Sequence, residues 1–215
     1  MQALRTQFLK TMGIQPWVLR ENKPIADENP WEALRCAVQQ CNACGLQKTR
    51  TQTVFGTGDP AAKLMIIGEA PGFYEDQQGE PFVGRAGQLL NAMLEAIGFT
   101  RKQVYIANIL KCRPPNNRDP LPEEVNHCTG FLEKQIALIQ PAVLLAVGRI
   151  AAHYLLNTKT SLSQIRGKVH TFGKLNTALV VTYHPAYLLR NPVDKQKAFL
   201  DLQLVSRKLG RDCEH

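Results

Sequence analysis

The sequence has no apolar run close to the roughly 20 residues that a membrane-spanning helix needs. Its first 20 residues lack the apolar segment followed by small residues that marks a secretory signal peptide. It also contains no internal repeat and no low-complexity segment. We therefore expect neither a membrane protein nor a secreted or repeat protein, and we expect a cytoplasmic location, where thiols stay reduced.

Acidic residues are few, because 18 Asp and Glu side chains stand against 26 Lys and Arg, which gives a formal net charge of +8 and a pI near 9.3. This excess of positive charge favours a polyanionic partner such as nucleic acid. Hydrophobic residues make up 44% and charged residues 20%, which is ordinary for a globular protein. At 215 residues the chain is long enough for one domain with a full core.

The beginning of the chain differs from the rest. A short amphipathic stretch ends near Trp17 and is followed by the polar, proline-containing segment ENKPIADENP. Such a segment is typical of a linker. The sequence therefore predicts an N-terminal peptide and linker over residues 1–30 and one domain over residues 31–215.

Apolar runs and helical patterns alternate along that domain. We expect strands in 63–72, where the run ends at glycine and proline, and in 104–110, 142–148 and 178–185. We expect helices from residue 31 to the first cysteine pair and over 86–99, 122–139, 149–156 and 193–209. Strands that are apolar throughout and alternate with helices indicate an α/β fold whose parallel sheet is covered on both faces.

Polar residues and glycines follow each expected strand at its carboxyl end. They are the GEAPG segment at 68–72, Asn108, Gly148 and His184. In open α/β sheets the ligand crevice lies beyond the carboxyl ends of the strands. The GEAPG segment has neither the spacing of a dinucleotide-binding loop nor that of a P-loop. We therefore expect a binding site at this edge, without a known phosphate loop.

Four cysteines have a spacing that suits a metal centre: 2, 67 and 15 residues separate Cys41, Cys44, Cys112 and Cys128. A thiolate quartet suits a tetrahedral metal ion or an iron-sulfur cluster. The spacing argues against zinc, since structural zinc sites come mostly from two close pairs on one small module. The alternative is that they are ordinary buried thiols. The remaining cysteines, Cys36 and Cys213, are expected to be free.

Four segments, in the order in which they occur along the chain, resemble the family 4 uracil-DNA glycosylases, the iron-sulfur branch of that superfamily. They are GEAPG at 68–72, GEPFVGRAGQLL at 79–90, KCRPPNNRDP at 111–120 and HPAYLLRNP at 184–192. The resemblance covers roughly residues 33–208 and implies a three-layer α/β sandwich with a short central parallel sheet. It also implies a 4Fe-4S cluster held by the four cysteines. A related branch that bonds covalently to uracil-containing DNA has a Lys-Arg-Arg-Ile-His insert, which is absent here, so we expect turnover.

The resemblance also implies a set of residues that bind the base. Phe82 would stack on uracil, and the amide of Asn108 would accept from N3-H and donate to O4, a pattern that cytosine reverses. Glu75 or the neighbouring Tyr74 would close off C5 and exclude the methyl group of thymine. Ala70 belongs to the same substrate-binding set.

Three further residues are implied as catalytic. Glu69 would lie near the anomeric carbon and stabilise the cationic sugar, although it can instead cap the following helix. His184 would hydrogen-bond uracil O2, as a neutral or a charged imidazole. Asn117 would hold the water or a phosphate.

The remaining implied contacts are with DNA, single or double stranded. Leu188 and Leu189 would fill the gap left by a flipped base. Phosphate contacts would come from basic residues around the pocket, namely Arg85, Lys111, Arg113, Arg118 and Arg190. The cluster would then have an architectural role, pinning a loop that contacts DNA.

Residues 1–20 contain LKTMGIQPWVLR, which resembles the N-terminal peptide of the psi subunit of the bacterial replicative clamp loader. This implies the clamp loader as a partner, and the alternative is a disordered or self-packed tail. The sequence as a whole predicts a monomeric base excision repair enzyme that hydrolyses the N-glycosidic bond of uracil. Two alternatives stay open, a non-catalytic metal-containing module that binds DNA or the clamp loader, and a small electron carrier.

Overall fold

The structure is a computed structural model that describes residues 11–13, 29–173 and 175–211. Most of the predicted N-terminal peptide and linker, including nearly all of the segment expected to bind the clamp loader, lies outside the described residues. In the described part of the chain, no helix is both long enough and apolar enough to cross a membrane.

A six-stranded sheet in the order β1-β3-β2-β4-β6-β5 forms the centre of the fold. Its strands are β1 (Thr57–Gly58), β2 (Leu64–Gly68), β3 (Tyr105–Asn108), β4 (Val143–Val147), β5 (Val169–Phe172) and β6 (Thr177–Thr182). The central strands β3, β2, β4 and β6 are parallel, as predicted. The edge strands β1 and β5 pair antiparallel and were not predicted. β1 has only two residues and β5 is partly exposed, so neither has an apolar run.

The helices are α2 (Pro30–Gln39), α3 (Phe73–Gln78), α4 (Arg85–Glu95), α5 (Pro122–Ile139), α6 (Arg149–Leu156), α7 (Leu162–Ile165), α8 (Pro185–Arg190) and α9 (Lys195–Lys208). Short 3-10 turns occupy Gly45–Lys48, Arg101–Gln103, Pro115–Asn117 and Pro192–Asp194. The predicted helices at 122–139 and 149–156 have the predicted bounds. The short helices α3, α7 and α8 were missed, since few residues cannot show a 3.6-residue period.

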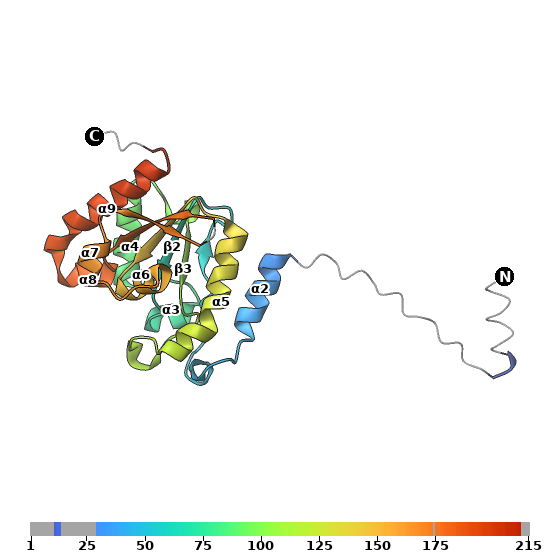
Figure 1. Ribbon diagram of the computed structural model, residues 1–215. Coiled ribbons are helices and arrows are strands. Elements are labelled where there is room, and N and C mark those ends of the chain that lie inside the picture. Colours follow the sequence, from blue (N-terminus) through green and yellow to red (C-terminus); the bar gives the residue numbers. More distant parts are fainter. Residues whose placement is uncertain (1–10, 14–28, 174, 212–215) are drawn as a thin grey trace, which may run out of the picture.

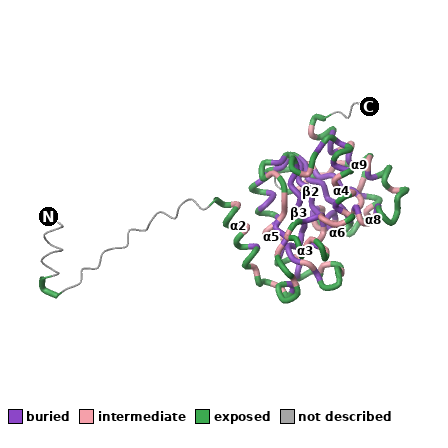
Figure 2. Tube along the Cα trace, turned by 180° about the vertical axis from the view of Figure 1, so that it is seen from behind, coloured by how far each residue is buried: buried purple, intermediate pink, exposed green. Residues whose placement is uncertain are grey.

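Both faces of the sheet are covered, which confirms the three-layer prediction. Successive residues of β2 point to opposite faces, so Ile67 packs under α5 and α6 and Ile66 packs under α4, α8 and α9. Figure 1 shows α4 and α9 on one side of the sheet and α5 on the other. Figure 2 shows the buried residues gathered around β2 and β3. The polar ends of the central strands are therefore the sheet positions open to a ligand.

Helix α2 lies outside this sandwich and packs on α5. Asn29 caps it, because its side-chain oxygen accepts from Trp31 N–H at 3.1 Å. The Trp31 ring meets Phe55 and Tyr105 edge-on, each at a centroid distance of 5.2 Å. These contacts hold the start of α2 against Phe55 and β3, while the first cysteine pair follows the other end of the helix.

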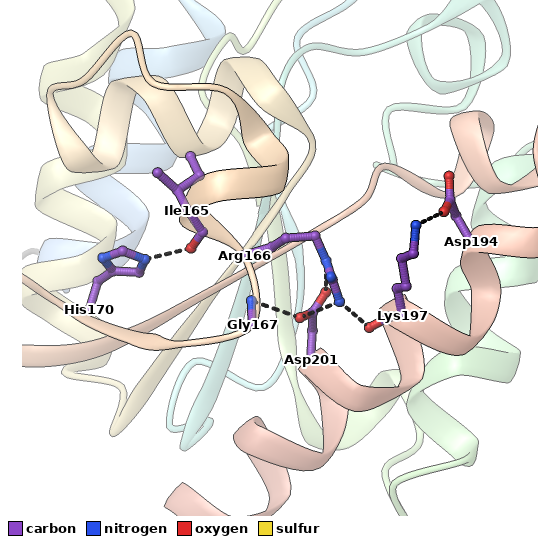
Figure 3. A network of polar contacts seen from close by, with 7 residues as sticks. All are labelled: Ile165, Arg166, Gly167, His170, Asp194, Lys197 and Asp201. Atoms are coloured by element: carbon purple, nitrogen blue, oxygen red, sulfur yellow. Dashed lines mark hydrogen bonds and ion pairs between the residues drawn. The ribbon is translucent and has the colours of Figure 1, made fainter.

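A buried ion pair ties α9 to the end of α7 (Figure 3). The Asp201 carboxylate is fully buried and accepts from Arg166 Nε at 3.0 Å, from Arg166 Nη2 at 2.8 Å and from Gly167 N–H at 3.0 Å. The Arg166 guanidinium also lies over the ring of Tyr183, 5.2 Å from its centroid. Because Tyr183 precedes His184, this network fixes the end of β6 from which His184 projects.

Candidate active site

The carboxyl ends of the four parallel strands meet at one edge of the sheet. In the register of β2 and β3, Gly68 lies beside Asn108, and in that of β4 and β6, Val147 lies beside Thr182. Asn108 is the last residue of β3, and the loops that leave β2 and β6 carry Glu69 and His184. The sheet therefore brings together the strand ends that the sequence singled out.

Gly68, Phe82, Asn108 and His184 form a group at this edge, called the recess below, in which two side chains pack directly against Gly68 because it has no side chain. A Cβ placed on Gly68 would lie 2.4 Å from Asn108 Oδ1 and 2.7 Å from Phe82 Cζ. The rings of Phe82 and His184 are stacked, with centroids 5.6 Å apart and an interplanar angle of 30°. A Cβ on Gly148 would lie 3.0 Å from His184 Cβ. An aromatic ring, an imidazole and an amide thus surround the ends of β2 and β4.

Asn108 is buried, with 2% of its surface exposed, and its Oδ1 atom has no hydrogen-bond partner among the described residues. Leaving a buried acceptor unpaired costs about 1–3 kcal/mol, so such atoms are rare and call for an explanation. A ligand that binds in the recess and donates a hydrogen bond to Oδ1 is such an explanation.

Phe82 is held in an uncommon backbone conformation. Its φ of 55° lies in the left-handed region, which a bulky residue seldom adopts. Arg101 fixes this turn, because its guanidinium donates to the carbonyl of Phe82 at 3.2 Å and to the carbonyl of Pro81. A Cβ on Gly87 would lie 1.7 Å from Phe82 O. Strain of this kind persists where the surroundings over-determine it, often at functional sites.

Glu75 supports the same turn from the other side. Its Oε1 accepts from Val83 N–H at 3.1 Å and from Gly84 N–H at 3.3 Å, at the start of α4. Tyr74 is 61% exposed, and its ring lies 3.6 Å from the position of a Cβ on Gly84. The carboxylate is therefore engaged with backbone, and the choice between Glu75 and Tyr74 at uracil C5 stays a prediction.

One ring nitrogen of His184 is engaged by its own helix. Its Nδ1 accepts from Ala186 N–H at 3.1 Å as the N-cap of α8, which puts the proton of a neutral ring on Nε2. The pKa of His184 is lowered to about 4, chiefly by burial and also by Arg190, against an opposing effect of Glu75. The structure therefore favours the neutral imidazole, a choice that the sequence left open.

Glu69 follows β2 directly and lies in a different electrostatic environment. The pKa of its carboxyl is raised to about 7, chiefly by burial and also by the negative charge of Asp119, while Arg149 opposes the shift. Arg149 donates to Asp119 Oδ2 at 2.9 Å, so the two tuning charges form a pair. Helix α3 starts behind Gly72 without a side-chain cap, so no hydrogen bond supports the alternative role of Glu69 as a cap.

The basic side chains of segment 111–118 are less available to DNA than predicted. Asn117 is exposed, and its Oδ1 accepts from Arg113 Nε at 2.8 Å. The Arg113 guanidinium lies over the Phe73 ring, 5.0 Å from its centroid. Arg118 is paired with both oxygens of Glu124, at 2.6 and 2.9 Å. The predicted phosphate contact of Arg118 would therefore compete with an ion pair.

Lys111 requires a correction. Only 1% of its surface is exposed, and its Nζ donates to Asn108 O at 2.8 Å and to Gln135 Oε1 at 2.7 Å. An ammonium in that position does not reach a DNA phosphate. The sequence analysis grouped Lys111 with the basic residues expected to contact phosphate because its neighbours Arg113 and Arg118 are basic.

The two leucines of the predicted wedge, Leu188 and Leu189, lie in different environments on α8. Leu188 is 1% exposed and packs in the core beneath α4 and α9, whereas Leu189 is 37% exposed. Only Leu189 is therefore presented to a partner. Arg190 and Arg85 are both exposed, at the end of α8 and at the start of α4.

The four predicted metal ligands line one cavity between the turn after α2, the end of β3 and α5. Its open space is about 350 Å³, solvent at its mouth included. Across the described ranges, no three His, Cys, Asp or Glu side chains are grouped so as to hold a single metal ion. Cys36 is exposed and free, while Cys213 lies outside the described residues.

Two donors point at the sulfur atoms of this cavity. Arg50 Nη1 donates to Cys112 Sγ at 3.0 Å, and Lys111 N–H donates to Cys128 Sγ at 3.2 Å. The pKa of the Cys128 thiol is raised to about 11, chiefly by burial, so a bound metal centre would favour the thiolate that burial disfavours. Four sulfurs around one cavity with N–H donors to them fit an iron-sulfur cluster, whose properties depend on such hydrogen bonds.

Residues 55–204 match the uracil DNA glycosylase superfamily, and the chain belongs to this superfamily. It is similar to the type-4 uracil-DNA glycosylase of Archaeoglobus fulgidus, with 42% identity over 181 residues that make up 81% of this chain and 90% of that protein. The type-4 enzyme of Sulfurisphaera tokodaii is 42% identical over 75% of this chain and 76% of its own. That of Thermotoga maritima is 44% identical over 72% of this chain and 80% of its own. Within the superfamily the chain is thus a type-4 member, which confirms the resemblance.

Sequence reasoning missed several residues of the site. The need for glycine at 68 was not recognised, although Gly68 opens the GEAPG segment that the sequence singled out. No signal in the sequence points to Arg101 or Arg50, because each acts through contacts with residues distant in the chain. The pair of Asp119 and Arg149 was missed for the same reason.

We expect Gly68→Ala to block the recess while the fold survives. The added methyl group would displace the Asn108 amide and the Phe82 ring, at a cost of about 1–3 kcal/mol in stability, and uracil excision should fall by about 100-fold. The measurement is single-turnover cleavage of a uracil-containing oligonucleotide together with the unfolding midpoint.

Gly130→Ala in α5 is the matched control. A Cβ there meets nothing within 4 Å, so this variant should keep wild-type activity and gain slightly in stability. Wild-type excision by Gly68→Ala would show that the base does not bind in this recess.

Proposed function

We propose that this protein is a uracil-DNA glycosylase of base excision repair, which flips uracil out of DNA and hydrolyses its N-glycosidic bond to leave an abasic site. The observation that carries this function is the unpaired buried Oδ1 of Asn108, which lies beside Gly68 next to Phe82, whose ring stacks on His184. The printed names of the relatives, type-4 uracil-DNA glycosylases, support it.

Recognition of the base uses three complementary contacts. Asn108 accepts from uracil N3-H through Oδ1 and donates to O4 through its amide nitrogen. Phe82 stacks on the base, which is worth about 1–3 kcal/mol. Cytosine presents an acceptor at N3 and a donor at C4, so it meets Asn108 with both contacts reversed. Together these contacts offset the cost of taking the base out of the stack.

Bond cleavage places positive charge on the sugar and negative charge on the departing base. Glu69 as a carboxylate stabilises the cationic sugar and orients a water. Neutral His184 donates from Nε2 to uracil O2 and stabilises the leaving anion. Because both groups are already fixed by the loops after β2 and β6, little reorganisation accompanies the charge separation. Asn117 and Ala70 keep their predicted places in this site as part of the proposal.

DNA contacts lie around the recess. Leu189 fills the space of the flipped base, and phosphate contacts come from the exposed Arg85 and Arg190 and from the half-buried Arg113. The net charge of +8 supports binding to either single-stranded or double-stranded uracil-containing DNA.

The cofactor of this enzyme is a 4Fe-4S cluster held by Cys41, Cys44, Cys112 and Cys128. When bound, it supplies a rigid link between α2, the end of β3 and α5, and no step of base excision passes through it. The common cavity and the two donors to sulfur support this assignment. The clamp loader as partner of residues 1–20, the monomeric state and the cytoplasmic location remain predictions from the sequence.

A non-catalytic module that binds DNA through a metal-containing loop explains the basic surface and the cysteines. It gives no reason for an unpaired buried amide oxygen, nor for a carboxyl whose pKa is raised to about 7 at the same edge of the sheet. An electron carrier leaves the same features unexplained. The glycosylase accounts for all of them.

The direct test is incubation with a uracil-containing oligonucleotide, followed by detection of alkali-labile abasic sites. Asn108→Asp should lose uracil excision, because its carboxylate sets an acceptor against uracil O4 at a cost of about 1–3 kcal/mol or more. Activity on a cytosine-containing strand is the comparison, and visible absorbance checks that the variant is folded. Unchanged uracil cleavage by Asn108→Asp would assign base reading to another residue.

The pKa of Glu69 predicts a pH profile. Since the carboxylate is the active form, the single-turnover rate should rise with pH up to about 7 and level off above it. Glu69→Gln should abolish this rise and lower the plateau by about 100-fold.

Two variants move the inflection without touching Glu69. Asp119→Asn removes a negative charge that raises the pKa, so the inflection should shift to lower pH. Arg149→Gln removes a positive charge that lowers the pKa, so the inflection should shift to higher pH. An inflection that persists in Glu69→Gln would assign the titration to another group.

The purified protein should be brown, with visible absorption and about four iron atoms per chain. Cys112→Ser should lose the iron and lower the soluble yield, since site-binding energy is also folding energy. Cys36→Ser is the control and should keep both, because Cys36 is exposed and remote from the cavity lining. A colourless protein that contains one zinc after anaerobic preparation would overturn the cluster assignment.

A further inference from the structure

Lys111 is the one buried lysine of the described residues, and its environment contains no carboxylate partner within hydrogen-bond range. An ammonium group is costly to bury unless its donors are satisfied. Here Nζ donates to one main-chain carbonyl, Asn108 O, and to one side-chain amide, Gln135 Oε1. We therefore expect this buried lysine to stabilise a group on which the fold or the site depends.

Gln135 is fully buried in α5 and its orientation is fixed. Its Nε2 donates to Phe55 O at 2.9 Å and to the Tyr105 hydroxyl at 3.2 Å. With both amide protons engaged, Oε1 is left to face Lys111. The ammonium is therefore positioned by α5 and by β3 rather than by its own loop.

The other end of this arrangement is the base reader. Asn108 is the last residue of β3, and the chain then turns, with Ile109 N–H donating to Gly68 O at 3.0 Å. The bond from Lys111 Nζ to Asn108 O fixes the peptide group that follows the Asn108 Cα, the atom that carries the side chain. The direction of Oδ1 depends on the orientation of that peptide group.

We propose that Lys111 is a positioning residue for uracil recognition: its buried ammonium, anchored by Gln135, holds the Asn108 backbone so that Oδ1 faces the recess. The inference rests on the proposed function, because it names the support of that same site. It assigns Lys111 no contact with DNA. It also gives the unpaired Oδ1 a cause, since the bond to Lys111 restrains the turn that would otherwise let the amide relax toward a partner.

Lys111→Met tests the inference, because methionine keeps the chain length of the apolar stem and removes every donor. We expect the single-turnover rate on uracil-containing DNA to fall by roughly 30-fold and inhibition by free uracil to weaken by a similar factor. The affinity for uracil-free DNA and its salt dependence should not change. A merely structural defect would not weaken uracil binding while leaving DNA binding intact.

Lys134→Met is the matched control, since it removes the same charge from an exposed position of α5 beside Gln135. It should leave free-uracil inhibition as in the wild type. Gln135→Met provides a second route if Lys111→Met does not fold, and it should weaken uracil inhibition in the same direction by a smaller factor. Iron content and circular dichroism report folding in each case.

The outcomes separate this inference from the proposed function. If the wild-type protein excises no uracil, the proposed function fails. If the wild type excises uracil and a folded Lys111→Met or Gln135→Met is inhibited by free uracil as strongly as the wild type, only the positioning role fails. A lower salt slope on uracil-free DNA in Lys111→Met would mean that Lys111 contacts phosphate, and would also overturn it.

Discussion

The parallel pairing of β2 with β3 places Gly68 beside Asn108, and the whole recess depends on Gly68 having no side chain. The Phe82 ring and the Asn108 amide occupy the space that a Cβ would need. The ring reaches that space only because the turn before α4 adopts a left-handed conformation, held by Arg101 on one side and by Glu75 on the other. A strand register, a missing methyl group and a strained turn therefore act together, and none of them forms the site alone.

One short segment serves both the base site and the cysteine cavity. Asn108 ends β3 and Cys112 follows four residues later, with Lys111 between them. The side chain of Lys111 bonds to Asn108 O, while its backbone N–H bonds to Cys128 Sγ. The proposed cluster, held in part by these two cysteines, would thereby fix the main chain from which the lysine reaches Asn108. On the proposed function this links the cluster physically to base recognition and gives it no role in bond cleavage.

The sequence predicted the central parallel strands, the long helices and the edge of the sheet that carries the site, because burial on both faces leaves continuous apolar runs and helical periods. It did not predict that Lys111 is buried, since Gln135, its partner, lies 24 residues away. It grouped Leu188 with Leu189, although a short helix sends one to the core and the other to solvent. Local patterns specify elements and their order. The direction of a single side chain depends on packing between elements, which spacing along the chain does not record.

Burial acts on the two groups proposed as catalytic in opposite chemical senses, and in both it favours the uncharged form. It raises the pKa of Glu69 and lowers that of His184, so each charged form is disfavoured before DNA arrives. In the proposed mechanism this suits His184, because a neutral ring with its proton on Nε2 would donate to the leaving base without repelling the cationic sugar. For Glu69 it is a cost in that mechanism, since the carboxylate is the form that would stabilise the sugar. Arg149 offsets part of that cost, and Asp119, its ion-pair partner, limits the offset. Burial is thus the main reason that the pKa of the Glu69 carboxyl lies near 7 and that the imidazole is neutral, while the exposed pair of Asp119 and Arg149 acts on the carboxyl in opposite directions.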